Sequence, residues 1–139
     1  MDLQLKVKTA IVTGGGRGIG KGCVAALAEE GCNVVVADLS HDGETMAFLE
    51  ELGRRTGAAL VPVDGDVSRE ETADEIFRTA LDRFGQVDIL VNNAGRGAIR
   101  KPFHELTTED WRSVQEITLN SQFFMSRAIV RLFRERDRA

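Results

Sequence analysis

Short, unbroken runs of apolar residues alternate along the chain with longer stretches in which apolar side chains recur every three or four positions. Unbroken runs are typical of strands buried on both faces of a parallel sheet, and the longer spacing is typical of helices. The predicted strands are residues 9–12, 33–38, 59–63 and 87–93. The predicted helices are residues 18–30, 43–55 and 73–84, followed by a long helix from about residue 108. This alternation predicts an α/β fold.

Pro62 lies inside the third predicted strand and limits the possible order of the strands. Proline cannot donate a hydrogen bond to a neighbouring strand, so it belongs at a sheet edge. Right-handed crossovers then favour the strand order 3-2-1-4, with a switch point between the first and fourth strands. The sequence therefore predicts one domain over residues 1–139, a Rossmann-like doubly wound parallel sheet. Its ligand crevice should lie at the carboxyl ends of the strands.

Composition and charge exclude several classes of function. The chain is 42% hydrophobic and 29% charged, which is ordinary for a globular protein, and its net charge of -4 argues against general nucleic-acid binding. It has no apolar stretch long enough to span a membrane. Cys23 and Cys32 lack the spacing of a metal site and are expected to be buried thiols in a reducing compartment, so we expect no metal and a cytoplasmic location.

Six glycines are concentrated in TGGGRGIGKG, residues 13–22, between the first predicted strand and the first predicted helix. Three phosphate-binding patterns compete for them. A P-loop would use Gly15, Gly20 and Lys21, but Gly22 stands where a hydroxyl should bind Mg²⁺. A G-x-G-x-x-A pattern that begins at Gly20 would fall inside the helix. Both are therefore poor explanations of the glycines.

The third pattern, T-G-x-x-x-G-x-G, puts each glycine where a turn from strand to helix needs it. Gly14 would end the strand, Gly18 would let the backbone approach a pyrophosphate, and Gly20 would let the helix pack close to the sheet. The free N–H groups at the start of the helix would face the phosphates. A tight turn without a ligand is the alternative interpretation.

Polar residues follow the other predicted strands at the same edge of the sheet. Asp38 ends the second strand, where a carboxylate can bind an adenosine ribose, although it could instead cap a helix or turn. Asp66 and Val67 follow the third strand. Asn92 and Asn93 end the fourth, and two adjacent asparagines there are costly unless their amides form hydrogen bonds.

Together these segments resemble the short-chain dehydrogenase/reductase family. The resemblance rests on TGGGRGIG, AD at 37–38, DV at 66–67, NNAG at 92–95 and Asn120. The stretch PFHELTTEDW adds similarity to members that resemble 3-oxoacyl reductases and sugar or alcohol dehydrogenases. The family implies an NAD(P)-dependent oxidoreductase that moves a hydride between nicotinamide and a carbonyl or alcohol carbon. The alternative is a non-catalytic nucleotide-binding or interaction fragment.

The resemblance also implies a role for each matching residue. The glycine turn would hold the pyrophosphate of the cofactor. The two aspartates and Val67 would hold its adenosine, and NNAG would line its nicotinamide side. The implied cofactor-binding residues are Gly14, Arg17, Gly18, Ile19, Gly20, Asp38, Asp66, Val67, Asn92, Ala94 and Gly95. Asn93 would brace the sheet. Asn120 would kink the long helix and hold a water in a proton relay, and its apolar neighbours Leu119 and Phe123 argue against a merely exposed role.

The chain departs from the family in one important respect, because it contains no tyrosine. The family uses a serine and then a tyrosine, which acts as general acid/base, followed four residues later by a lysine. The chain is therefore expected to be truncated before the later strands and inactive alone. His41, expected on the adenosine side, and His104, expected at the surface, are poor substitutes for the tyrosine.

The expected cofactor is NAD(H) rather than NADP(H). Asp38 would repel a 2′-phosphate and pair with a free 2′-hydroxyl, although Arg17 is evidence for NADP(H). A small carbonyl or alcohol compound would be the substrate of the intact enzyme.

The last helix is apolar on two sides, so it needs two partners. One side carries Val114, Ile117, Phe124, Ala128 and Leu132, and the other carries Leu119, Phe123, Val130 and Phe133. We expect the sheet to cover one side and a second subunit the other, which gives a homo-oligomer through residues 111–134.

Overall fold

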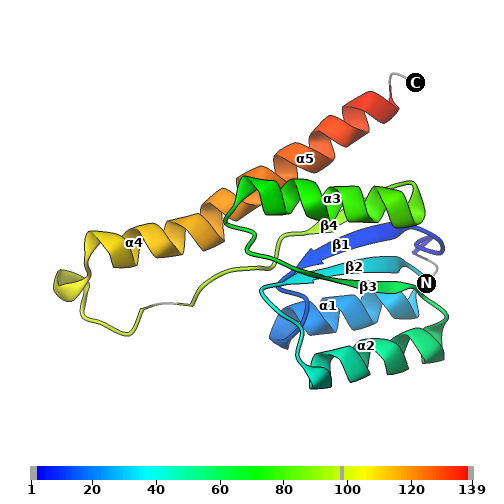
Figure 1. The fold of residues 1–139 in the computed structure, drawn as a ribbon, viewed down its shortest axis with the longest axis horizontal. Coiled ribbons are helices and arrows are strands. Elements are labelled where there is room, and N and C mark those ends of the chain that lie inside the picture. Colours follow the sequence, from blue (N-terminus) through cyan, green and yellow to red (C-terminus); the bar gives the residue numbers. More distant parts are fainter. Residues whose placement is uncertain (1–2, 98, 138–139) are drawn as a thin grey trace.

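Strands and helices alternate along the chain, as the apolar pattern predicts (Figure 1). The computed structural model describes residues 3–97 and 99–137, so both ends of the predicted domain 1–139 lie outside the described residues. The strands are β1 (Thr9–Thr13), β2 (Asn33–Asp38), β3 (Leu60–Asp64) and β4 (Ile89–Val91). The helices are α1 (Gly18–Glu29), α2 (Gly43–Thr56), α3 (Glu70–Phe84), α4 (Thr108–Gln115) and α5 (Ser121–Arg136), with a 3₁₀ turn η1 (Phe103–Glu105) and a π-helical turn η2 (Glu116–Asn120).

The sheet has the order β3-β2-β1-β4 with parallel pairing, which confirms the predicted Rossmann-like topology. Pro62 lies on the edge strand β3, opposite Val36 of β2. The fourth strand was predicted over residues 87–93 but is shorter, since it begins at Ile89 and ends at Val91. The switch point therefore lies between β1 and β4.

Two apolar cores lie on opposite faces of the sheet, and helices cover both (Figure 1). Neighbouring residues of one strand point to opposite faces. Ile11 of β1 accordingly packs toward α3 and α5, whereas Val12 packs toward α1 and α2. The strands β1 and β2 are buried on both faces, which explains their unbroken apolar sequence, whereas most residues of the outer strands β3 and β4 are half-buried.

The predicted long final helix is a single helical run whose hydrogen bonding changes in the middle. It begins at α4 with a capping box, in which Thr107 and Asp110 satisfy each other's backbone N–H groups. A hydrogen bond from Lys101 lowers the pKa of Asp110 to about 2. The π-helical turn η2 then joins α4 to α5. In Figure 1, α4 projects beyond the sheet while α5 lies over it beside α3.

The two apolar sides of α5 have different environments. Phe124, Ala128 and Leu132 pack against the core under α3, as expected for the covered side. Phe133 was expected on the other side but also packs against this core, because it follows buried Ile129 by one helical turn. The remaining residues of that side, Leu119, Phe123 and Val130, are exposed.

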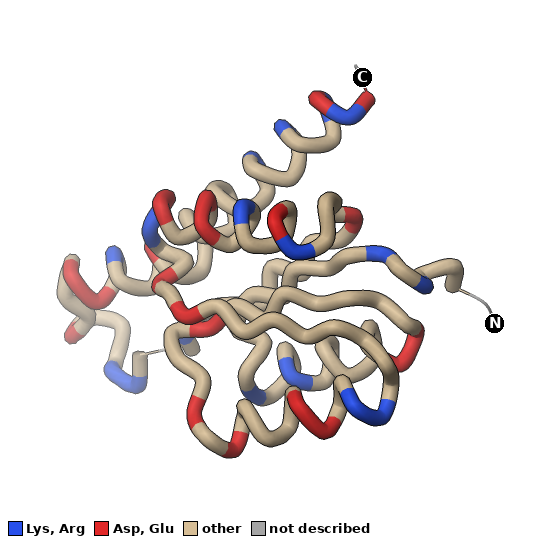
Figure 2. The backbone as a smooth tube through the Cα atoms, turned by 45° about the vertical axis from the view of Figure 1, so that its right-hand side comes forward, with Lys and Arg blue, Asp and Glu red and all other residues tan. Residues whose placement is uncertain are grey.

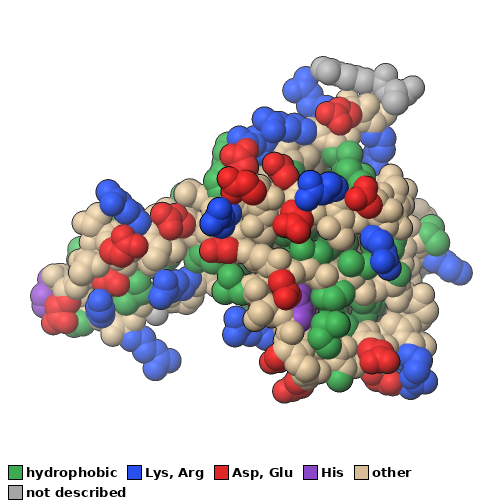
Figure 3. Space-filling model, viewed as in Figure 1, with side chains coloured by type: hydrophobic (Ala, Val, Ile, Leu, Met, Phe, Trp, Pro, Cys, Tyr) green, Lys and Arg blue, Asp and Glu red, His purple; other side chains and the backbone are tan. Residues whose placement is uncertain are grey.

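Charged residues of both signs lie on the surface of the molecule, although those of α5 are mainly arginines (Figures 2 and 3). This distribution matches the small net charge of the chain. In the described part of the chain, no helix combines the length and apolar character needed to cross a membrane.

Candidate functional site

The glycine turn after β1 depends on close backbone packing. Gly14 follows the strand with φ +64°, a conformation that side chains disfavour. A Cβ atom on Gly20 would lie 2.0 Å from the carbonyl oxygen of Gly14 and 2.6 Å from Nδ2 of Asn93. Glycine at position 20 therefore lets the first turn of α1 lie directly against the end of β1.

The start of α1 offers polar hydrogens without a side-chain acceptor. Arg17 is the N-cap residue, but its side chain makes no capping hydrogen bond, and the first turn of α1 contains no acidic residue. Arg17, Gly18 and Ile19 are exposed here. A helix start of this kind carries N–H donors and a partial positive charge, which suit an anionic group.

The carboxylate of Asp38 is turned toward the glycine turn. Its Oδ2 accepts a hydrogen bond from the N–H of Gly16 at 2.9 Å, and its Oδ1 accepts one from the N–H of Leu39 at 2.8 Å. The helix cap of α2 is a different residue, Asp42, which accepts from the N–H of Thr45 at 2.8 Å. This hydrogen bond lowers the pKa of Asp42. Asp38 therefore caps the glycine turn and does not cap α2.

Asn93 and Thr13 join the ends of β4 and β1. Nδ2 of Asn93 donates to the carbonyl oxygens of Thr13 and Gly14, each at 3.0 Å. The hydroxyl oxygen of Thr13 accepts from the N–H groups of Asn93 and Ala94, at 3.1 Å and 3.0 Å. These hydrogen bonds link the end of β4 to the end of β1, which is the contact that a bracing role for Asn93 needs. No role for the hydroxyl of Thr13 could be predicted from the sequence, because its partners lie about eighty residues away.

A cavity of about 190 Å³ opens where these groups meet. It is lined by Gly14, Arg17, Asp38, Leu39, Gly65, Val67, Asn93, Ala94, Gly95 and Ile117. Arg17 also lines a smaller hollow of about 120 Å³, with Asp38 and Ser40, and a more open one of about 450 Å³, with Asp66. The cavity lies at the carboxyl ends of the strands, at the predicted switch point.

Several predicted site residues lie around this cavity without lining it. Gly18, Ile19 and Gly20 belong to the start of α1. Asn92 donates from Nδ2 to the hydroxyl of Ser126 on α5 at 3.0 Å, a partner that the sequence did not indicate. The hydrogen bond between Asn92 and Ser126 joins the end of β4 to α5 beside the cavity.

Asp66 and Asn120 have different surroundings. Oδ1 of Asp66 accepts from the N–H of Ser68 at 2.9 Å, which holds the turn after β3. Asn120 ends the π-helical turn and is exposed, as are Leu119 and Phe123. The apolar neighbours of Asn120 therefore do not bury it within the described residues. Asn120 thus closes a π-helical turn within the long helix, and its expected kink and bound water stay predictions.

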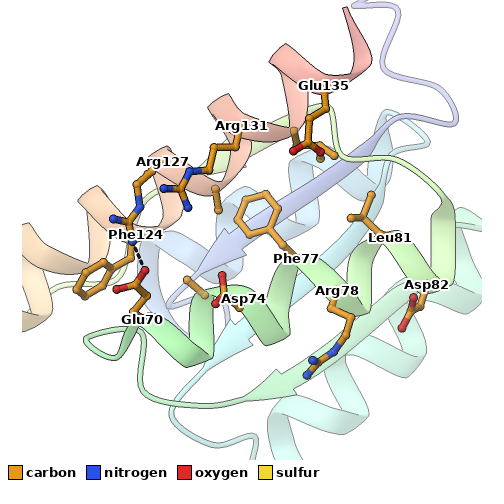
Figure 4. Close-up of a pocket in the computed structure, with 13 residues that line it drawn as sticks. Glu70, Asp74, Phe77, Arg78, Leu81, Asp82, Phe124, Arg127, Arg131 and Glu135 are labelled. Carbon is orange, nitrogen blue, oxygen red and sulfur yellow. Dashed lines mark hydrogen bonds and ion pairs between the residues drawn. The ribbon is translucent and has the colours of Figure 1, made fainter. Parts of the chain in front are cut away.

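A second groove, of about 330 Å³, lies between α3 and α5 (Figure 4). Phe77 and Phe124 contribute to its apolar floor, and Glu70 on one rim forms an ion pair with Arg127 on the other. None of the predicted cofactor-binding residues lines this groove. We therefore assign the candidate site to the cavity beside the glycine turn.

The cysteines and His104 give no sign of a second reactive centre. Cys32 is buried, and burial raises the pKa of its thiol to about 11. Cys23 packs against the core between the sheet and α1 but is only half-buried, so the prediction of two buried thiols is wrong for this residue. His104 is 82% exposed, as expected. Residues 3–97 and 99–137 contain no group of three or more residues that could hold a metal ion.

Comparison with known protein families matches residues 8–139 to the short chain dehydrogenase family, and the chain belongs to this family. It is 38% identical over 131 residues to glucose 1-dehydrogenase 2 of Bacillus subtilis, covering 92% of this chain and 49% of that protein. It is 37% identical over 123 residues to a hydroxynaphthalene reductase-like protein of Metarhizium majus, covering 88% of this chain and 45% of that protein. The chain thus spans about half the length of these relatives.

Solved reductase structures also resemble this chain over about half of their length. An NADPH-dependent 3-quinuclidinone reductase of Rhodotorula rubra superposes with a TM-score of 0.86 at 28% identity, over 95% of this chain and 49% of that one. An L-sorbose reductase of Gluconobacter frateurii, complexed with NADPH and L-sorbose, gives a TM-score of 0.88 at 28% identity, over 98% and 51% of the two chains.

Two glycines of α1 provide a matched test of the site geometry. Gly20→Ala should destabilise the chain by about 1–3 kcal/mol, because its Cβ would overlap the backbone of Gly14. Gly22→Ala has open space around its Cβ and should stabilise the helix by up to about 1 kcal/mol. Thermal unfolding of both variants is the measurement. Equal effects would contradict the close packing described here.

Proposed function

We propose that this chain forms the dinucleotide-binding part of an NAD(P)-dependent oxidoreductase of the short-chain dehydrogenase family. The observation that carries the proposal is the cavity in which the glycine turn, Asp38 and the Asn93–Gly95 segment meet at the carboxyl ends of β1, β2 and β4. The family membership and the similarity to two reductases described with NADPH support it. The substrate would be a small carbonyl or alcohol compound.

The residues present fit a dinucleotide. The start of α1 has N–H donors without a side-chain cap, and Gly14 and Gly18 bring no side chain into the surrounding turn. We assign the pyrophosphate to this turn, the adenosine to Asp38, Asp66 and Val67, and the nicotinamide side to Asn92, Ala94 and Gly95. When bound, the nicotinamide would donate or accept the hydride, and the chain's own residues would hold and orient it.

Cofactor choice provides the first test of this proposal. We propose NAD(H) over NADP(H), because Asp38 lines the cavity as a carboxylate and would repel a 2′-phosphate. Asp38→Ser should reduce the preference for NAD⁺ by about tenfold, whereas Asp82→Ser, in the groove between α3 and α5, should not change it. Calorimetric titration with NAD⁺ and NADP⁺ is the measurement. Tighter binding of NADP⁺ to the unmodified chain would contradict the preference, and binding of neither would favour an interaction fragment.

Turnover provides the second test, and we expect none from this chain alone. Hydride transfer to a carbonyl leaves an alkoxide that needs a proton, and a positioned acid contributes typically about 10²–10⁴-fold. The chain has no tyrosine, and we assign Asn120 to holding a water, since an amide cannot act as a base near neutral pH. Absorbance of NADH over a panel of alcohols, sugars and keto compounds is the assay. Turnover that is lost in His104→Ala would show that the site has been misassigned.

We also propose that the chain associates with a second copy through residues 111–134. The exposed side chains of Leu119, Phe123 and Val130 on this segment support the proposal, together with the unpaired edge of β4. Phe123→Gln combined with Val130→Gln should shift the chain toward monomer in light scattering. Phe103→Gln, an exposed residue outside the segment, is the control. A monodisperse monomer at high concentration would contradict the proposal.

A cytoplasmic location is a further part of the proposal. It rests on Cys23 and Cys32, which are both unpaired thiols, as is usual in a reducing compartment.

A further inference from the structure

The turn between β2 and α2 contains a buried histidine that faces none of the three hollows around the glycine turn. The side chain of His41 is only 2% exposed, and its Nδ1 lies 2.5 Å from Oδ1 of Asp64, which is 65% exposed at the end of β3. An ionised carboxylate can only accept, so Nδ1 of His41 is the donor. The contact therefore joins the β2–α2 turn to the neighbouring strand.

Burial alone does not favour a histidine at this position. Its second nitrogen, Nε2, is buried and has no hydrogen-bond partner in the described structure. An unpartnered buried polar atom costs free energy, so an apolar side chain of similar size would be better for stability. The hydrogen bond to Asp64 is the property of this histidine that such a side chain could not replace.

The residues just before His41 form part of the walls of the candidate site. Leu39 lines the main cavity and Ser40 lines the smaller hollow of about 120 Å³. Asp38 lines both of them. Residues 39–42 belong to neither strand nor helix. The end of β2, just before this segment, is joined to the end of β3 by the N–H of Gly65, which donates to the carbonyl oxygen of Asp38 at 2.8 Å. The segment itself is joined to the end of β3 by the contact between His41 and Asp64.

We infer that His41, through Asp64, is a positioning residue that keeps the carboxylate of Asp38 turned toward the glycine turn. It thereby contributes to selection between dinucleotides with a free and with a phosphorylated ribose 2′-hydroxyl. If this tie is lost, the 39–42 segment can move, and the hydrogen bonds from Gly16 and Leu39 to Asp38 weaken. The selection part of the inference rests on the proposed function, whereas the positioning of Asp38 does not.

The first experiment measures the positioning without any ligand. Exchange of the Gly16 amide hydrogen with D₂O, followed by NMR, reports its hydrogen bond to Asp38. His41→Leu and Asp64→Ala should each speed this exchange by at least about fivefold, since each removes one partner of the tie. His41→Asn keeps a donor near the position of Nδ1 and should restore slow exchange. His104→Leu, which alters the exposed histidine, is the control.

The second experiment measures the ratio of NAD⁺ to NADP⁺ affinity by calorimetry in the same variants. His41→Leu and Asp64→Ala should lower the preference for NAD⁺ by about threefold or more, and His41→Asn should retain it. Because Asp64 is largely exposed, Asp64→Ala tests the tie even if His41→Leu fails to fold.

The outcomes separate this inference from the proposed function. Unchanged Gly16 exchange in Asp64→Ala, or equally fast exchange in His104→Leu, would overturn the positioning of Asp38. Faster exchange with an unchanged affinity ratio would overturn the part concerning selection. Failure of the unmodified chain to bind either nucleotide would contradict the proposed function and with it the role in selection, while Gly16 exchange would still decide whether His41 positions Asp38.

Discussion

The amide of Asn93 holds the ends of β1 and β4 together, and the candidate site depends on this junction. Parallel strands at a switch point diverge into connections that run to opposite faces of the sheet, so a crevice opens between their ends. Asn93 spans that gap by donating to the carbonyl oxygens of Thr13 and Gly14. The same amide lies so close to Gly14 and Gly20 that neither position has room for a Cβ. The asparagine and the glycine turn are therefore one structural unit.

Two further hydrogen bonds stabilise the site outside this junction. Asp38 reaches across from β2 and accepts from the N–H of Gly16, which ties the glycine turn to a third strand. Asn92 reaches in the other direction and donates to Ser126 on α5. Polar groups at the ends of three strands are thus satisfied by one another, which limits the cost of burying them beside the cavity. The start of α1 lies outside this network, and its exposed residues 17–19 leave it accessible to an anionic ligand.

Most of the architecture could be predicted from the sequence, because it follows from local patterns. Unbroken apolar runs predicted the strands, and Pro62 predicted the edge strand, from which right-handed crossovers gave the order of the sheet. Contacts between distant residues have no such local signal. The hydroxyl of Thr13, the partner of Asn92 and the pair of His41 with Asp64 became visible only in three dimensions. Phe133 was misassigned for a related reason: a helical pattern shows which residues are apolar but not which neighbour covers them.

The double role of Asp38 explains why cofactor preference is difficult to infer from this residue type alone. Each oxygen of its carboxylate already accepts one backbone N–H, yet each has a second lone pair that can accept from a ribose hydroxyl. Two backbone N–H groups therefore hold the carboxylate of Asp38 in position before any ligand arrives. Arg17, by contrast, is exposed and makes no capping hydrogen bond. We therefore propose that Asp38, whose carboxylate two backbone N–H groups hold in position, influences cofactor selection more than Arg17 does.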